Sequence, residues 1–172
     1  GHDKSAALRR AFDEAFARPP LDRADDRERL LKVQIGSDGY AFRLAEVAGF
    51  VAARKIVPLA STVPGALGLA GIRGSLVPVY SLATLLGHPA EDDPARWFVL
   101  CAAPEPLALA FARFDGYLEA PRAELHPLSG EAERRQVPGV VRAEARNWGV
   151  ISIPALTETI ATSVVGNTSK ER

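Results

Sequence analysis

Residues 68–89 read GLAGIRGSLVPVYSLATLLGHP and combine three signals in one short stretch. Arg73 lies between glycines and precedes an apolar strand at 76–79, and an amphipathic turn of helix follows directly. Ser81 is placed to cap this helix, and Gly87 is placed to end it. Because Arg73 has no acidic residue nearby in the sequence, it is either a structural arginine or a contact for a partner.

The composition predicts one soluble cytoplasmic domain. The 172 residues are enough to bury a hydrophobic core, and 21 basic residues balance 21 acidic ones. That balance leaves no electrostatic footprint for nucleic acid or an anionic membrane. No apolar run approaches the ~20 residues that span a bilayer, so we expect no direct membrane insertion. The single cysteine excludes an intramolecular disulfide, which is typical of a reducing compartment.

Short apolar runs separated by glycine and proline predict an all-β fold. The run at 30–44 is typical of a hairpin, with turn residues at 37–39. Frequent turn signals favour barrels or a sandwich over a βαβ sheet, and no glycine-rich loop for a nucleotide is present. The expected strands lie at 30–36, 40–44, 50–59, 76–79, 97–103, 107–120, 139–144 and 148–153.

Two segments of the sequence repeat the same order of elements. Residues 71–87 and 144–161 each read as a turn, an apolar strand and a short helix. Pro154 suits the first turn of the second helix. This repetition predicts two small β-barrels side by side, each closed by a helical segment.

Both ends of the chain are predicted to lie outside the barrels. Residues 1–29 combine an amphipathic helix at 5–18 with a linker that is too charged to pack. The apolar face of that helix either packs on the barrels or docks in a groove of a partner. We expect the globular domain at 30–163 and a disordered tail at 164–172.

The sequence contains no set of residues that predicts catalysis. His88 and His126 each precede a proline, which predicts solvated histidines at turns. Cys101 lies within a predicted strand and is expected to be a small buried hydrophobe. Trp97 and Trp148 begin strands and are expected in core or barrel-end packing. Because zinc-ligand spacing and a nucleophile motif are both missing, we expect no enzyme, no metal and no cofactor.

The stretch at 68–89 resembles the signature of the CheW-like domain, the coupling protein of bacterial chemotaxis arrays. That signature reads roughly G-(V/L)-x-N-L-R-G-x-(V/I)-(V/L)-P-(V/I)-x-D-L, before a helix that ends near Leu-Gly. The resemblance covers about residues 30–161, including 56–59 upstream and 114–117 downstream. The matching residues of the central motif are Gly68, Ile72, Arg73, Gly74, Val77, Pro78, Val79, Leu82, Leu86 and Gly87.

This resemblance implies a fold and a role. The fold would be two SH3-like five-stranded β-barrels around a shared core, without catalysis. The role would be that of a cytoplasmic adaptor at receptor clusters. Members bridge the cytoplasmic tip of a chemoreceptor and the regulatory domain of a CheA-type histidine kinase, which has the same fold, and other CheW-like domains are further partners.

Three alternatives stay open beside the adaptor. The first is an accessory CheW-like protein that binds receptors or array components but not the kinase. The second is a regulatory-domain fragment of a larger signalling protein. The third is a small-barrel enzyme or ligand-binding domain, which requires a convergent polar pocket.

The resemblance also implies a surface for partners. Arg73 matches the family arginine that is associated with receptor-side coupling. Residue chemistry alone favours an internal role for Arg73, in which it caps backbone carbonyls at its turn or pairs with a distant carboxylate such as Asp115. The expected partner-binding residues are Leu44, Val47, Gly49, Val51, Gly71, Ile72, Arg73, Gly74, Asp115 and Tyr117.

Several positions depart from the family pattern. Gly71 replaces an asparagine, and Ser81 replaces an aspartate although it keeps the ability to cap a helix. Gly49 stands where the family has a glutamate, on the side that faces the kinase in the family's complexes. Its absence removes a potential charge-assisted contact of about 1–3 kcal/mol. Kinase binding is therefore the part of the family role that this sequence weakens.

Overall fold

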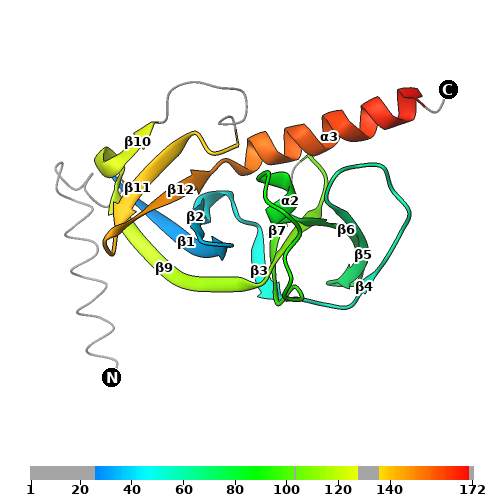
Figure 1. Cartoon of the computed structure of the whole chain (residues 1–172), viewed down its shortest axis with the longest axis horizontal. Coiled ribbons are helices and arrows are strands. Elements are labelled where there is room, and N and C mark those ends of the chain that lie inside the picture. Colours follow the sequence, from blue (N-terminus) through cyan, green and yellow to red (C-terminus); the bar gives the residue numbers. More distant parts are fainter. Residues whose placement is uncertain (1–25, 103, 128–135, 171–172) are drawn as a thin grey trace, which may run out of the picture.

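Two six-stranded β-sheets, each curled into a barrel, make up the computed structural model of this chain (Figure 1). The structure describes residues 26–102, 104–127 and 136–170. The helix predicted at 5–18 lies outside the described residues. We call the two units barrel A and barrel B.

Barrel A is built from two separate parts of the chain. Its strand order is β10-β11-β12-β2-β1-β9, with β12 parallel to β2 and the other neighbours antiparallel. A single turn of 3-10 helix precedes β10. Its strands are β1 (Arg27–Ile35), β2 (Asp38–Arg43), β9 (Arg113–Pro121), β10 (Leu125–Pro127), β11 (Gly139–Ala143) and β12 (Arg146–Ile151).

Barrel B is inserted between β2 and β9 and follows a short 3-10 turn at Leu44–Glu46. Its strand order is β3-β7-β8-β6-β5-β4, with β6 parallel to β8. Each barrel therefore contains one parallel pair at the corresponding point of its sheet. Its strands are β3 (Gly49–Ala52), β4 (Ile56–Val57), β5 (Ala66–Ile72), β6 (Ser75–Ser81), β7 (Trp97–Cys101) and β8 (Leu107–Phe111).

In each barrel, one strand of the parallel pair leads directly into a helix, as the repetition in the sequence predicts. These strands are β6 in barrel B and β12 in barrel A. α2 (Leu82–Leu85) begins after Ser81, whose hydroxyl accepts the backbone N–H of Thr84 at 3.3 Å. Gly87 ends this helix with a φ of 86°, which a glycine adopts without strain. α3 (Ile153–Lys170) follows β12 and crosses above barrel B (Figure 1).

The hairpins that precede these helices also correspond. Arg73 and Gly74 form the two-residue turn between β5 and β6, with φ angles of 52° and 79°. Glu144 and Ala145 form the turn between β11 and β12, with φ angles of 55° and 62°. Two consecutive positive φ angles are typical of a type I′ turn, whose twist matches that of the flanking strands.

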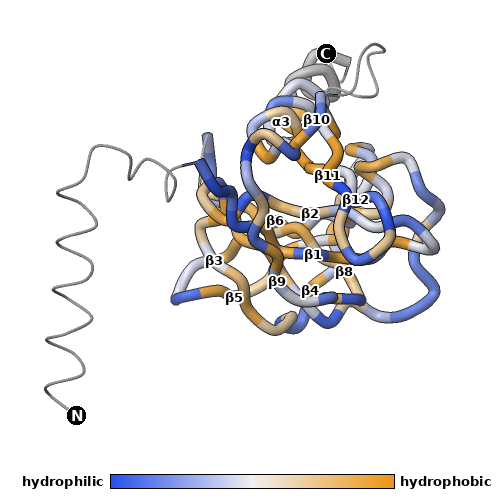
Figure 2. Tube along the Cα trace, turned by 90° about the vertical axis from the view of Figure 1, so that its left-hand side faces the viewer, coloured by the Kyte–Doolittle hydropathy of each residue, from blue (hydrophilic) through white to orange (hydrophobic). Residues whose placement is uncertain are grey.

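A shared core joins the two barrels, as the resemblance to the CheW-like domain implied. Leu31 and Phe42 of barrel A, Leu109 and Phe111 of barrel B, and Leu156 of α3 are fully buried in one cluster. Each barrel also contains a smaller core of its own. The hydropathy-coloured tube shows hydrophobic segments running through the centre of the molecule (Figure 2). The two barrels and α3 therefore pack as one unit.

An aromatic cluster continues this core to the surface at the junction. Phe50 of β3 stacks on Trp97 of β7, with ring centroids 5.0 Å apart. Phe50 also contacts Phe111 of β8 and Phe114 of β9, the latter at 4.8 Å. Tyr117 of β9 extends the cluster outward from Phe114 at 5.3 Å. Because β9 belongs to barrel A, these rings tie the two barrels together.

The strands differ from the sequence expectation in three respects. Each sheet has six strands rather than five, because the short β4 and β10 also pair. The run at 107–120 is two strands that separate at Ala112. β5 was not expected, because its glycines at 68 and 71 weaken the strand signal.

Two elements extend past the predicted domain limits. β1 begins at Arg27, inside the predicted linker, and the Arg27 Nε lies 2.9 Å from a Glu119 carboxylate oxygen across the sheet. α3 continues to Lys170, into the segment predicted as a tail. Within the described residues, no helix combines the length and apolar character needed to cross a membrane.

Candidate functional site

Arg73 occupies a strained backbone position at the tip of the β5–β6 hairpin. A non-glycine residue in the left-handed region costs about 1–2 kcal/mol, and Arg73 adopts a φ of 52° there. The side chain is exposed. Since glycine fits such a turn better, local backbone stability does not explain the arginine.

The guanidinium of Arg73 lies against Gly49, the first residue of β3. A Cβ added at Gly49 would lie 2.9 Å from the Arg73 Nη2 and 3.0 Å from the Leu100 Cδ1. Arg73 forms no hydrogen bond or ion pair with any residue that the structure describes, and Asp115 is not its partner. Neither of the two internal roles considered for Arg73 is therefore seen in this part of the chain.

Apolar grooves run from the Arg73 turn toward α3. A groove of about 250 Å³ has Ile72, Arg73 and Leu107 among its lining residues. It shares Ala48 and Ala102 with a larger groove of about 680 Å³, which α3 borders on its far side. Arg73 therefore borders an apolar groove that adjoins the larger groove beside α3.

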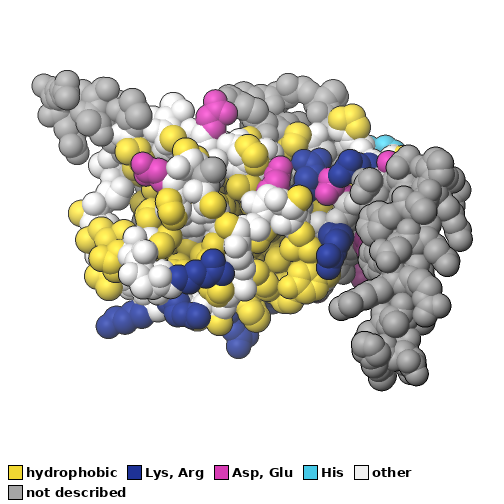
Figure 3. Space-filling view, turned by 180° about the vertical axis from the view of Figure 1, so that it is seen from behind, with side chains coloured by type: hydrophobic (Ala, Val, Ile, Leu, Met, Phe, Trp, Pro, Cys, Tyr) yellow, Lys and Arg dark blue, Asp and Glu magenta, His cyan; other side chains and the backbone are white. Residues whose placement is uncertain are grey.

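The outer face of the β4–β5–β6 sheet is also apolar. Leu76 is 73% exposed, and Val57 and Leu59 are each more than half exposed. The strand register sets Val57 beside Leu69 and Leu69 beside Pro78. Seen from behind, hydrophobic side chains gather over the barrel B half, with lysine and arginine along its lower edge (Figure 3). A contiguous exposed apolar face of this kind is typical of a protein-binding surface.

The structure brings only part of the predicted partner-binding set together. The Arg73 guanidinium reaches Gly49 of β3, and Gly71 and Gly74 are exposed on the same hairpin as Arg73. Ile72 is 7% exposed and packs in the core of barrel B. Of the other predicted residues, Leu44, Val47 and Val51 are half-buried in or near β3 and the 3-10 turn, and Asp115 and Tyr117 are exposed on β9 of barrel A.

Leu76 was not among the predicted partner-binding residues, although it is the most exposed large hydrophobic side chain among the described residues. A signal for it was present, because β6 alternates. Val77 and Val79 point inward, so Leu76 and Pro78 must point outward. An apolar residue at an outward position of a half-buried strand is informative about binding.

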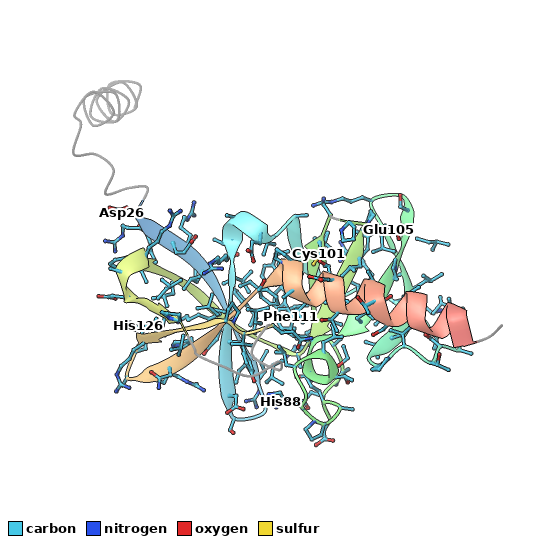
Figure 4. The ribbon with its side chains drawn as sticks, turned by 90° about the horizontal axis from the view of Figure 1, so that it is seen from above. Asp26, His88, Cys101, Glu105, Phe111 and His126 are labelled. Atoms are coloured by element: carbon cyan, nitrogen blue, oxygen red, sulfur yellow. The ribbon has the colours of Figure 1, made fainter. Side chains whose placement is uncertain are left out.

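The two described histidines and the cysteine do not converge (Figure 4). His88 is half-buried rather than solvated, and its Nε2 lies 2.7 Å from the Tyr40 hydroxyl. His126 is exposed, within β10 rather than at a turn. Burial, with a smaller contribution from the charge of Glu46, raises the pKa of the Cys101 thiol to about 12. No group of three metal-ligating side chains occurs in the described part of the chain.

Comparisons with known proteins agree with this arrangement of two barrels. The CheW-like domain family matches residues 29–161. The scaffolding protein TtCheW from Thermoanaerobacter tengcongensis has a similar solved structure, with a TM-score of 0.68 and 15% sequence identity, covering 76% of this chain and 92% of TtCheW. A search of curated proteins found no match.

These observations define the class of protein by its fold, which is two β-barrels around a shared core. The family match extends over most of the chain, and the structural likeness extends over nearly all of TtCheW. The chain belongs to the CheW-like domain family, and this confirms the family and the fold that the stretch at 68–89 predicts.

Proposed function

We propose that this protein is a non-catalytic adaptor of a bacterial chemosensory complex, cytoplasmic and located at receptor clusters. It couples the cytoplasmic tip of a chemoreceptor to the regulatory domain of a CheA-type histidine kinase. Membership of a scaffold family supports the adaptor role. The observation that carries it is the Arg73 turn, where a strained, exposed cation without a partner among the described residues adjoins apolar grooves.

Surface placement favours a binding role for this turn over a structural one. A residue held in a sparsely populated conformation is most often explained by function when nothing local rewards it. Arg73 gains no internal hydrogen bond there, yet its guanidinium and Leu76 are presented on the same hairpin. A guanidinium beside an apolar surface is also a common composition of protein-binding hot spots.

The mechanism that we propose is positional. The shared core and the aromatic cluster make the two barrels a single rigid body, so a partner bound at one barrel has a fixed orientation relative to the other barrel. A displacement of the receptor tip would then move the kinase regulatory domain as well. No step of this coupling requires chemistry in the adaptor.

The experiment is calorimetric titration of the protein against two probes from its own genome: a chemoreceptor hairpin tip and a CheA-type regulatory domain. Binding of both probes, with micromolar or tighter affinity, is the expected result. Arg73→Glu should abolish receptor binding and leave the circular dichroism spectrum and melting temperature unchanged. Binding of neither probe by the folded wild-type protein would contradict the adaptor role, and global unfolding of Arg73→Glu would make the residue structural.

Gly49 favours a second candidate function, that of an accessory protein that joins receptors without carrying the kinase. The family glutamate at this position is missing, and the Arg73 side chain fills the space beside the glycine. The same titrations separate the candidates. Receptor binding without kinase binding would identify the accessory protein.

A further inference from the structure

Gly49 is not required by the backbone of β3. Its φ lies outside the left-handed region, so any residue could adopt its conformation. Gly68 of β5 provides a contrast within the same sheet, since its φ is 145° and an added Cβ would lie 2.0 Å from the Val57 carbonyl oxygen. Gly68 is therefore a backbone glycine, whereas Gly49 needs another explanation.

Gly49 leaves room for the Arg73 side chain, which lies beside it. The nearest atom to an added Cβ at Gly49 is the Arg73 Nη2, at 2.9 Å. The Leu100 Cδ1 would lie at 3.0 Å, so a side chain at position 49 would press on both Leu100 and the guanidinium, and the guanidinium, at the end of a long flexible side chain, would move away from β3. With glycine there, the cation lies close to the backbone, beside the apolar groove at Leu100. Glycine 49 thus determines where the charge of Arg73 is presented.

The surroundings of this charge are basic. Ile56 pairs with Ala70 in antiparallel register, which sets the residues before β4 at the same end of the sheet as the Arg73 turn. Those residues are Arg54 and Lys55, both exposed. None of these three cations forms an ion pair with a described residue. This end of barrel B therefore has complementary charge for an acidic partner.

We propose that Gly49 leaves Arg73 dependent on a carboxylate that the partner supplies. The partner is an acidic segment of the chemoreceptor tip. It presents an Asp or Glu side chain to the guanidinium and an apolar neighbour to the groove of about 250 Å³. A charge-assisted, bidentate contact of this kind gives both affinity and orientation. This inference rests on the proposed function and names the chemistry of its receptor contact.

The decisive comparison is between Gly49→Glu and Gly49→Gln. Both variants place a side chain of nearly equal size against Arg73, but only the glutamate can pair with the guanidinium within the same molecule. We expect Gly49→Glu to bind the receptor tip roughly tenfold more weakly than Gly49→Gln, because an internal ion pair replaces the external one. Gly49→Ala controls for displacement of the guanidinium alone, and thermal melting controls for folding.

Two further measurements locate the carboxylate. Wild-type affinity for the tip should fall as salt rises from about 50 to about 300 mM, and Gly49→Glu should show a weaker salt dependence. Among tip variants with single Glu→Gln or Asp→Asn changes, one should reproduce the loss. That variant should cause no additional loss in Arg73→Gln, since the two side chains form one contact.

The outcomes separate this inference from the proposed function. If the wild-type protein binds the tip but Gly49→Glu and Gly49→Gln bind equally well, the partner carboxylate is refuted while the adaptor role stands. Salt-independent binding would refute it in the same way. If the folded wild-type protein binds neither the tip nor the kinase domain, both proposals fail together.

Discussion

Lys32, a buried residue of β1, forms an ion pair with Glu144, an exposed residue of the β11–β12 turn. The two side chains are 6% and 59% exposed, and the Lys32 Nζ lies 5.0 Å from the centre of a Trp148 ring. Glu144 occupies in barrel A the turn position that Arg73 occupies in barrel B. The charge of Glu144 is therefore paired within its own barrel, whereas the charge of Arg73 has no ion-pair partner among the described residues.

Removing the carboxylate should destabilise barrel A. Glu144→Gln keeps an oxygen that can accept a hydrogen bond from Lys32 but removes the negative charge that pairs with the buried ammonium, so we expect the free energy of unfolding to fall by about 1–3 kcal/mol. Urea denaturation followed by Trp148 fluorescence measures this change. Lys32→Met should be tolerated to within about 1 kcal/mol, because an apolar side chain of similar length suits the same site. Equal losses in both variants would show that the charge is not the cause.

Replacing Ala145 of the same turn by glycine should stabilise the protein. Ala145 adopts a φ of 62°, which costs about 1–2 kcal/mol, and glycine removes that cost while adding unfolded-state entropy. Ala145→Gly should therefore raise the free energy of unfolding by about 0.5–1 kcal/mol. Ala52→Gly, in the extended strand β3, is the matched control and should lower it. A loss of stability in Ala145→Gly would argue against strain at this turn.

The aromatic cluster should be a major source of stability at the junction. Phe50→Ala removes a half-buried ring that contacts Trp97, Phe111 and Phe114, and we expect a loss of about 2–3 kcal/mol, below the value for a fully buried ring, with a changed Trp97 emission. Tyr117→Ala provides the control, because this ring is 59% exposed at the outer end of the cluster and its loss should cost less than about 1 kcal/mol. Similar losses would mean that the cluster does not join the barrels.

The Cys101 thiol should make the fold sensitive to alkaline pH. Its pKa rises from 9.0 to about 12 on folding, so the folded state holds the proton longer than the unfolded chain does. Below pH 9.0 both states are protonated and nothing changes. Above it, wild-type stability should fall relative to Cys101→Ala by about 1.4 kcal/mol per pH unit. Parallel pH profiles of the two proteins from about pH 8 to about pH 10.5 would contradict this expectation.

Local signals in the sequence predict much of this fold, and long-range contacts account for what was missed. The repeated turn, strand and helix at 71–87 and 144–161 indicate the two barrels, because each unit carries its own caps and alternation. The Glu144–Ala145 turn has no glycine to mark it, and Leu156 of α3 is buried by core residues that are distant in the sequence. The meeting of Arg73 with Gly49 joins residues 24 positions apart, which no local pattern reveals.

The insertion of barrel B between β2 and β9 has a consequence for synthesis on the ribosome. Roughly 70 residues separate the end of β2 from the start of β9, and at 5–20 residues per second they take about 4 to 14 s to emerge. At the end of this interval barrel B has its full set of strands, whereas β1 and β2 still lack every other strand of their sheet. The nascent chain should therefore complete the barrel that carries Arg73 first and close the other around it afterwards.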